Sequence, residues 1–221
     1  MKVLVVGASR GIGWAFVQRY LAEGATVLAT ARHDEDLQRL AALGAHTLRM
    51  DVADAAGSTG LAWASDGWAF DAVIVNAGVY GPPRAAFDVP TEAEFDAVMH
   101  TNVLGAMRVL AQVEPVLAPQ AKLVLISSNM GSLALRTRAS IWLYRASKAA
   151  LNSVLKDASL ALAGRAVCVA LHPGWVRTAM GGPEAPLAPD ESVQAMCRVI
   201  AGLQPSDNGA FLDYQGAPLP W

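Results

Sequence analysis

Short, uninterrupted apolar runs alternate with longer amphipathic segments through most of this 221-residue chain. The apolar runs predict six strands, at residues 3–6, 25–30, 46–50, 72–75, 123–126 and 167–171. Apolar residues at helical spacing predict helices over 12–23, 34–43 and 142–163, each followed directly by a glycine. Strands that are apolar throughout and alternate with helices form parallel sheets with both faces covered. We therefore expect an α/β fold with a doubly wound parallel sheet of about seven strands, six of which these runs locate.

The composition supplies enough apolar surface for such a core. The chain is 53% hydrophobic and 16% charged, whereas disordered chains are poor in apolar residues and rich in charge. A length of 221 residues suits one large domain, so we expect a single domain over residues 1–221. The formal net charge of -2 lacks the basic excess that is typical of nucleic-acid-binding proteins, so no nucleic-acid partner is expected.

Cysteine usage and the N-terminus narrow the class of protein further. Cys168 and Cys197 lie among apolar residues and are expected to be buried thiols, and no Cys/His cluster predicts a metal site. The first apolar run ends at Gly7, too early for the core of a signal peptide. No apolar stretch approaches the roughly 20 residues that cross a bilayer. We therefore expect a soluble, cytoplasmic protein with no membrane partner.

A glycine-rich turn follows the first predicted strand and opens the first predicted helix. It reads Gly7-Ala8-Ser9-Arg10-Gly11-Ile12-Gly13. Glycines let the backbone approach a pyrophosphate closely, and the N-terminus of a helix favours an anion. The spacing is GxxxGxG and not the better-known GxGxxG, so a tight turn without a ligand is the alternative. The position of this turn, at the first βα connection, favours dinucleotide binding.

The end of the second strand bears on which dinucleotide is bound. An acidic residue at this place would hydrogen-bond the ribose 2'-hydroxyl of NAD, whereas an arginine accommodates the 2'-phosphate of NADP. The chain reads Thr30-Ala31-Arg32 here, with no carboxylate before Asp34, and Arg10 supplies a second cation nearby. Either arginine can also be an ordinary surface charge. Together they predict NADP(H), with NAD(H) as the less favoured cofactor.

Tyr144 and Lys148 lie four positions apart at the start of the long helix and therefore share a helix face. A free tyrosine has a pKa of about 10, which suits proton transfer near neutrality poorly. A nearby ammonium group favours the phenolate and lowers that pKa. Such a pair also occurs by chance on many helices, so its weight depends on the motifs around it.

These motifs follow one another in an order that resembles the short-chain dehydrogenase/reductase family over nearly the whole chain. They are the turn at 7–13, Asn76-Ala77-Gly78, Asn102, Ser127-Ser128 and Tyr144-x-x-x-Lys148. Residues 131–132, 144–152, 173–178 and 219–221 are similar to the C-factor-like and Sniffer-like carbonyl reductase branch.

The resemblance implies a Rossmann-type catalytic domain in an oxidoreductase. Such an enzyme would transfer a hydride between NADP(H) and a small carbonyl or alcohol substrate. Family members are often dimers or tetramers, so a homodimer or homotetramer is expected.

The resemblance also implies roles for individual residues in the chemistry. Tyr144 would be the general acid in carbonyl reduction and the base in the reverse direction. Lys148 would lower the Tyr144 pKa and hold the nicotinamide ribose, and Asn102 would anchor a water that links Lys148 to solvent. Without the family pattern, Asn102 would be an ordinary polar helix residue.

On the cofactor, the resemblance implies three groups of contacts. Residues 76–78 would line the adenine-ribose side, Asp51 and Val52 would meet the adenine, and Thr178 would bond the nicotinamide carboxamide. Taken alone, Asp51 would be a plausible helix N-cap. The full predicted cofactor set is Gly7, Ser9, Arg10, Gly11, Ile12, Gly13, Arg32, Asp51, Val52, Asn76, Ala77, Gly78, Tyr144, Lys148, Pro173, Gly174, Val176 and Thr178.

The catalytic serine is where this sequence departs from the family pattern. The family commonly places it about thirteen residues before the tyrosine, and Gly131 stands there in this chain. Ser128, just past the fifth strand, is the preferred candidate, and it would hydrogen-bond the carbonyl oxygen as that atom gains charge. Ser127 and Ser132 remain alternatives.

The substrate side is less defined by sequence. Arg136, Arg138 and Arg177 could attract an acidic substrate, although arginines at such places are more often simply exposed. Apolar candidates for the pocket, which could equally belong to the core or an interface, are Tyr80, Met130, Trp142, Trp175 and Met180.

A second class of function has to be weighed against the enzyme. The same fold could serve a nucleotide-binding regulatory or signalling protein with little or no turnover. The intact Asn102, Tyr144 and Lys148 favour the enzyme, because a pure binder needs no proton donor.

Overall fold

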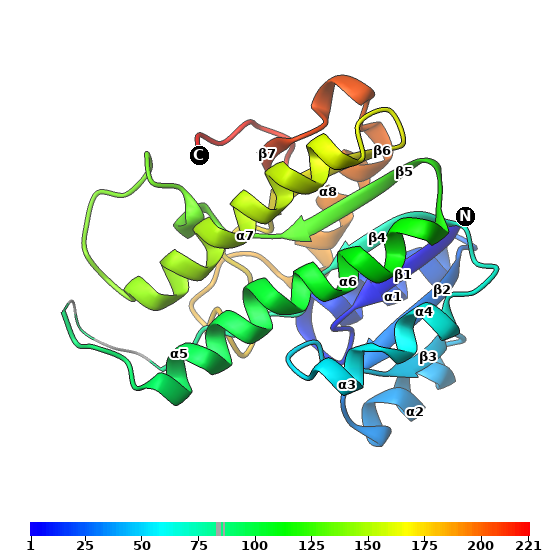
Figure 1. Cartoon of the computed structure of the whole chain (residues 1–221), viewed down its shortest axis with the longest axis horizontal. Helices are drawn as coiled ribbons and strands as arrows, with labels where there is room; N and C mark the ends of the chain where they lie inside the picture. Colours follow the sequence, from blue (N-terminus) through cyan, green and yellow to red (C-terminus); the bar gives the residue numbers. More distant parts are fainter. Residues whose placement is uncertain (83–84, 86) are drawn as a thin grey trace.

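The computed structural model describes residues 1–82, 85 and 87–221. Its strands form one seven-stranded sheet in the order β3-β2-β1-β4-β5-β6-β7, and every neighbouring pair is parallel (Figure 1). The strands are β1 (Lys2–Val6), β2 (Thr26–Ala31), β3 (His46–Arg49), β4 (Phe70–Val75), β5 (Leu117–Ile126), β6 (Ala166–His172) and β7 (Ala210–Asp213). The doubly wound parallel sheet predicted from the apolar runs is confirmed.

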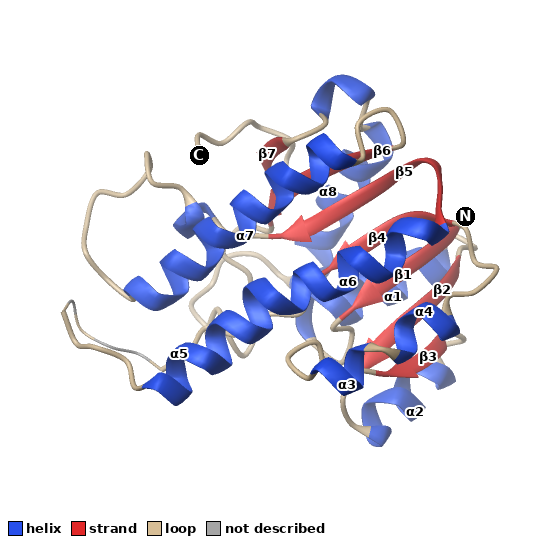
Figure 2. Cartoon of the chain, in the orientation of Figure 1, coloured by secondary structure: helices blue, strands red, loops and turns tan. Residues whose placement is uncertain are grey.

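Helices connect the strands and cover both faces of the sheet (Figure 2). The α-helices are α1 (Gly11–Ala22), α2 (Asp34–Ala42), α3 (Ala55–Ser58), α4 (Gly60–Ala64), α5 (Glu92–Met99), α6 (Gly105–Val113), α7 (Trp142–Ala161) and α8 (Pro189–Gly202). A π-helical turn, η1 (His100–Leu104), joins α5 to α6, and three 3-10 turns are η2 (Glu114–Val116), η3 (Asn129–Gly131) and η4 (Pro205–Asp207). Within the described ranges, no helix is both long and apolar enough to span a bilayer.

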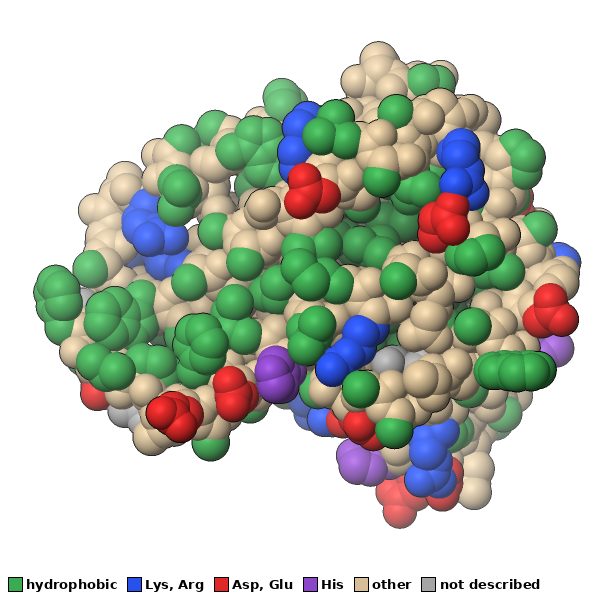
Figure 3. Space-filling view, viewed as in Figure 1, with side chains coloured by type: hydrophobic (Ala, Val, Ile, Leu, Met, Phe, Trp, Pro, Cys, Tyr) green, Lys and Arg blue, Asp and Glu red, His purple; other side chains and the backbone are tan. Residues whose placement is uncertain are grey.

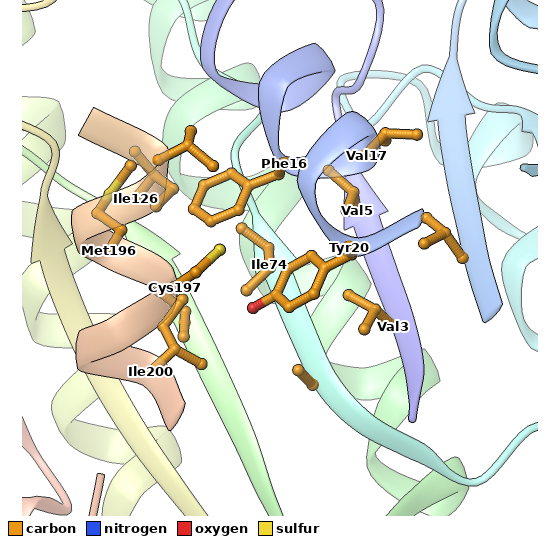
Figure 4. Packing of buried hydrophobic residues seen from close by; sticks show 14 of the residues in the cluster. Val3, Val5, Phe16, Val17, Tyr20, Ile74, Ile126, Met196, Cys197 and Ile200 are labelled. Carbon is orange, nitrogen blue, oxygen red and sulfur yellow. The ribbon is translucent and has the colours of Figure 1, made fainter. Parts of the chain in front are cut away.

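Two hydrophobic clusters, one on each face, hold the helices to the sheet. On the first face α1, α2 and α8 pack together, and Figure 4 shows Phe16 of α1 and Met196 of α8 over strand residues such as Val5. On the second face α4, α6 and α7 contribute Leu61, Val109, Leu155 and others to the cluster. Burial of apolar surface on both faces is the main favourable term for such a fold.

The strands differ most from the sequence-based expectation at two places. The strand β7 has four residues and was not located, because its Ala-Phe-Leu-Asp sequence is too short to show a period. The strand β5 begins at Leu117, six positions before the predicted start at 123. Its pairing with β4 shifts register between Phe70 and Ala72, and Gln120 has a φ of 62°.

Both expected buried thiols, Cys168 and Cys197, are buried.

The sheet order fixes where a ligand can bind. The chain winds outward from β1 to β3 and then returns to β4 on the other side of β1. In open α/β sheets ligands bind outside the carboxyl ends of the strands, at the point where the strand order reverses. The turns after β1 and β4 meet at that point.

Candidate active site

The turn after β1 is too tightly packed to carry side chains at two of its glycines. A Cβ added at Gly13 would lie 2.1 Å from the Gly7 carbonyl oxygen, and one at Gly7, where φ is 83°, would lie 2.7 Å from the Cα of Ala77. Asn76 donates from Nδ2 to the Gly7 carbonyl at 2.8 Å. The turns after β1 and β4 are therefore locked together.

The same packing leaves a cradle that fits a pyrophosphate. The helix α1 starts at Gly11, and its N-cap residue, Arg10, offers no side-chain cap to the free backbone N–H groups of the first turn. Backbone donors at an uncapped helix N-terminus, beside glycines with no side chains, bind an anion readily. The predicted residues Ser9 and Ile12 lie in this turn and are partly buried.

The end of β2 lies beside this cradle. Thr30 accepts a hydrogen bond at Oγ1 from the Gly7 amide at 3.1 Å. The Arg32 side chain is 58% exposed, and its Nη1 lies 3.9 Å from Oδ2 of Asp51, so the guanidinium is only loosely held. Arg10 is exposed as well. Both predicted cations are therefore available to a phosphate group.

Two further candidates for contacts with the adenine, Asp51 and Val52, lie in a turn after β3. Asp51 accepts a hydrogen bond at Oδ1 from the Ala53 amide at 2.9 Å, and Asp54, not Asp51, is the N-cap of α3. Val52 is buried in the second core cluster, and its carbonyl accepts from Nη1 of Arg108 at 3.0 Å.

Tyr144 lies in the first turn of α7 with 7% of its surface exposed. Its ring is tilted against that of Tyr80, with the centroids 4.7 Å apart, and the Ser128 side chain lies close to its phenol. Burial raises the pKa of Tyr144 to about 12, while Ser128 acts to lower it and Tyr80 acts to raise it. The sequence-based expectation was a lowered pKa, so burial outweighs the effect expected from Lys148 in the protein alone.

Lys148 is almost completely buried one helical turn further on. Its Nζ donates to the Ile126 carbonyl at 2.9 Å and lies 5.8 Å from the centroid of the Tyr144 ring. Burial lowers the pKa of Lys148 to about 8. A Cβ added at Gly78 would lie 3.5 Å from this Nζ, so the turn after β4 closes over the ammonium group.

Asn102 lies in the π-helical turn between α5 and α6, a type of irregularity that is frequent at functional sites. Its Oδ1 accepts from the Val79 amide at 2.8 Å, and its Nδ2 donates to the Val79 carbonyl at 2.8 Å. The same Nδ2 donates to Oγ of Ser147 at 2.9 Å, and Ser147 in turn donates to the Tyr144 carbonyl at 2.8 Å. Asn102 thus ties the β4 turn to the first turn of α7.

The three candidate serines have three different environments. Ser127 donates to Oδ1 of Asn152 at 2.6 Å, and Ser132 donates to the Pro220 carbonyl at 2.6 Å. Ser128 is the one that contacts Tyr144, and its Oγ also accepts from the Met130 amide at 3.1 Å. At the position where the family commonly has serine, a Cβ added to Gly131 would lie 2.9 Å from the backbone carbon of Lys148.

The segment after β6 returns to the glycine-rich turn. Gly174 has a φ of 82°, and Val176 pairs with Leu187 in an isolated bridge. The methyl group of Thr178 would lie 3.1 Å from a Cβ at Gly11, so the two predicted cofactor segments adjoin. The predicted residue Pro173 starts this segment, and its carbonyl accepts from Ser192 at 2.6 Å.

The substrate-side candidates divide into two groups. Tyr80 lies against Tyr144, whereas Trp175 and Met180 are about half exposed. Arg177 donates to the Ala185 carbonyl at 3.3 Å and so holds its own loop. Met130 lies in η3, two residues after Ser128.

Two residues of the tyrosine–lysine motif were missed by sequence reasoning. Ser147 links Asn102 to α7, and Arg145 is buried although its charge suggests a surface residue. Their position between Tyr144 and Lys148 was the available signal. Across the part of the chain that the structure describes, no group of three or more His, Cys, Asp or Glu residues is placed to hold a metal ion.

The sequence model of the family described as short chain dehydrogenase matches residues 1–186. The protein C-signal of Myxococcus xanthus is 44% identical over 154 residues, which are 68% of this chain and 92% of that protein. A putative short-chain dehydrogenase/reductase from Burkholderia multivorans with bound NADP is 33% identical with a TM-score of 0.90, over 100% of this chain and 99% of that one. An NADPH-bound carbonyl reductase from chicken fatty liver is 32% identical with a TM-score of 0.89, over 100% and 98% of the two chains. The carbonyl reductase Sniffer of D. melanogaster is 28% identical with a TM-score of 0.90, over 100% and 99%.

Proposed function

This chain belongs to the short-chain dehydrogenase/reductase family, and from that premise we propose that it transfers a hydride between NADP(H) and a small carbonyl or alcohol substrate. It is an NAD(P)-dependent oxidoreductase, and the proposal concerns its cofactor preference, its substrate class and its catalytic residues. The observation that carries the proposal is the grouping of Tyr144, Ser128 and Lys148 at the carboxyl edge of the sheet, beside the glycine-rich turn.

The proposed chemistry assigns one task to each side chain. The bound nicotinamide supplies or accepts the hydride. Tyr144 gives its phenolic proton to the carbonyl oxygen as that oxygen gains charge. Ser128 donates a hydrogen bond to the same oxygen, and the Lys148 ammonium stabilises the phenolate that remains on Tyr144. Asn102 acts through Ser147 and Val79, so it is a positioning residue in this scheme.

The residues of the cradle fit the dinucleotide as follows. Gly7, Gly11 and Gly13 would let the backbone and the α1 N-terminus hold the pyrophosphate. Arg10 and Arg32 would take the 2'-phosphate, which agrees with the NADP and NADPH bound by the Burkholderia and chicken proteins.

Three further groups complete the proposed cofactor site. Asp51, Val52 and residues 76–78 would line the adenine side, and residues 173–178 would hold the nicotinamide through Thr178. Residues 1–221 together would form the one catalytic domain.

We further propose that the protein is a homodimer or homotetramer. An apolar cavity of about 580 Å³ lies between α5 and the start of α7, and it includes the exposed side chains of Phe95 and Trp142. Figure 3 shows hydrophobic side chains gathered on this face. A second copy of the chain would cover them. Light scattering of the wild type and of a Phe95→Glu variant tests this. The wild type is expected to be oligomeric, and the variant, which places a charge in the apolar face, is expected to be monomeric.

The test of the proposed activity follows NADPH absorbance with a panel of aldehydes, diketones and quinones. The wild type is expected to turn over at least one class, and Tyr144→Phe is expected to lose turnover but keep NADPH binding. A matched Tyr20→Phe variant removes a hydroxyl from the core beside α8 and should leave turnover unchanged. Tight NADPH binding without turnover of any carbonyl would favour the nucleotide-binding signalling role instead.

A further inference from the structure

A second cavity lies beneath the loop that precedes α7, and its lining is unusually basic. The cavity has a volume of about 390 Å³, and Arg136, Arg138 and Arg145 contribute to its wall. The rings of Phe87 and Trp142 form another part of the wall, with their centroids 6.0 Å apart and nearly perpendicular. Figure 3 shows basic side chains gathered within the arch of this loop, at the left of the view.

Arg145 is the unexpected member of this group. Its surface is only 8% exposed, and its guanidinium donates to Oγ of Ser140 at 3.3 and 3.4 Å. Over the described residues, none of these three arginines forms an ion pair with a carboxylate. Burial lowers the pKa of Arg145, and the positive charges of Arg136 and Arg138 lower it further. A buried charge without a counterion is costly, so the site is more stable with an anion in it.

The helix beside the cavity adds to the positive potential. The helix α7 starts at Trp142 after Ile141, which has a φ of 35° and supplies no side-chain cap, and its first turn holds no acidic residue. The N-terminus of a helix is its positive end, so an arginine in the first turn is placed against the dipole. Three guanidinium groups and an uncapped helix N-terminus therefore face one volume without compensation from the residues described around it.

One residue of the cavity wall, Arg145, lies next to the reacting phenol in the chain. Arg145 follows Tyr144 directly in α7, and it interacts electrostatically with Tyr80. The Tyr80 ring lies 4.7 Å from the Tyr144 ring, so Arg145 acts on an aromatic ring that contacts the proton donor.

We propose that this cavity is an anion subsite, and that the preferred substrate is a carbonyl compound carrying a carboxylate or phosphate group away from its carbonyl. The aromatic wall formed by Phe87 and Trp142 would pack against the apolar part of the substrate that joins the two groups. The inference rests on the proposed reductase function and adds its substrate class.

The test compares three aldehydes of matched shape in NADPH-dependent reduction. They are para-formylbenzoate, para-formylphenyl phosphate and the neutral methyl para-formylbenzoate. The wild type is expected to show a kcat/KM for at least one anion about tenfold or more above that of the neutral ester, as one charge-assisted hydrogen bond would supply. The preferred anion identifies carboxylate or phosphate as the natural group.

Two variants and one control locate the effect. Arg145→Met and Arg138→Met are expected to raise the KM of the anionic aldehyde while leaving that of the neutral ester within about twofold. Arg138 is exposed on the loop, so its variant still tests the site if Arg145→Met fails to fold. Arg198→Met removes an exposed arginine on α8 and should change neither substrate.

The outcomes separate this inference from the proposed function. Turnover of the neutral ester with no preference for either anion would overturn the anion subsite and leave the reductase intact. A preference that survives both arginine variants would also overturn it. If no aldehyde is reduced, the reductase proposal fails, and calorimetric titration with benzoate and inorganic phosphate then decides whether the wild type binds an anion that Arg138→Met does not.

Discussion

The Lys148 ammonium nitrogen lies 5.8 Å from the centre of the Tyr144 ring, and both side chains are more than nine-tenths buried. Burial acts on their two pKa values in opposite directions. It lowers that of Lys148 to about 8 and raises that of Tyr144 to about 12. Both groups therefore hold their protons together only below a pH of about 8.

The rate of carbonyl reduction should fall as the pH rises through about 8. The phenol stays protonated well beyond that pH, but Lys148 loses the charge that stabilises the developing phenolate. The kcat/KM for reduction, measured from about pH 6 to about pH 10, reports ionisations of the free enzyme. A rate that stays level across that range would contradict the role of Lys148.

The same burial predicts a pH-dependent stability. Unfolding returns Lys148 from a pKa of about 8 to its ordinary 10.5, so between these values the unfolded chain binds more protons and stability rises with pH. Relative to Lys148→Met, the wild type should gain up to about 3 kcal/mol in unfolding free energy over this window. Urea titrations of both proteins at several pH values measure this difference. A constant difference would argue against a buried ammonium.

Ser128 and Ser132 should separate cleanly in function. Ser128→Ala should lower kcat by about 100-fold, because it removes a donor aimed at the reacting oxygen, and should cost about 1 kcal/mol in stability, because its Oγ accepts from the Met130 amide. Ser132→Ala should lower stability by about 1 kcal/mol and leave kcat near wild type, because Ser132 holds the Pro220 carbonyl. Steady-state kinetics and thermal unfolding of both variants decide the assignment, and the reverse pattern would move the catalytic role to Ser132.

Arg32→Asp should weaken NADPH far more than NADH, since it replaces a cation with a repelling carboxylate beside the 2'-phosphate site. A rise of about tenfold or more in the KM for NADPH is expected. Arg32→Ser removes the cation without adding an anion. It therefore separates the lost attraction for the phosphate from the repulsion that an introduced carboxylate adds, including repulsion with Asp51, whose Oδ2 lies 3.9 Å from Nη1 of Arg32. Arg198→Asp controls for net charge. An unchanged cofactor preference in both Arg32 variants would defeat the NADP(H) assignment.

Gly13→Ala should disrupt the cofactor cradle. The added methyl would meet the Gly7 carbonyl at 2.1 Å, so the turn must shift, at a cost of about 1–3 kcal/mol in stability. NADPH binding, followed by fluorescence, should be lost or greatly weakened. Gly202→Ala is the matched control, because a Cβ there meets nothing within 4 Å. Normal NADPH affinity in Gly13→Ala would mean that the close approach is not needed.

Much of the sheet could be predicted because parallel strands buried on both faces leave continuous apolar runs. The strand β7 could not be located, since four residues give no period. The early start of β5 was missed because Pro119 interrupts the apolar run and because the sequence does not reveal the positive φ of Gln120. Both are set by pairing with a neighbouring strand.

The candidate site shows the same limit. Tyr144, Lys148 and Asn102 could be named from their ordered motifs, and the structure brings them together. The burial of Arg145 could not be foreseen, because sequence gives its charge but not the loop folded over it. The pKa of Tyr144 was expected to fall, whereas burial raises it. The sequence spacing reveals the neighbouring lysine but not the loss of solvent around the phenol.

The contact of Gly131 with α7 limits where a serine fits beside the helix. A serine at position 131 would place its Cβ 2.9 Å from the Lys148 backbone and 3.0 Å from Nδ2 of Asn152, so it would push η3 away from the helix that carries the tyrosine. The spacing between Ser128 and Tyr144 is thus coupled to the path of the loop, and a serine moved to position 131 would require η3 to be reshaped as well.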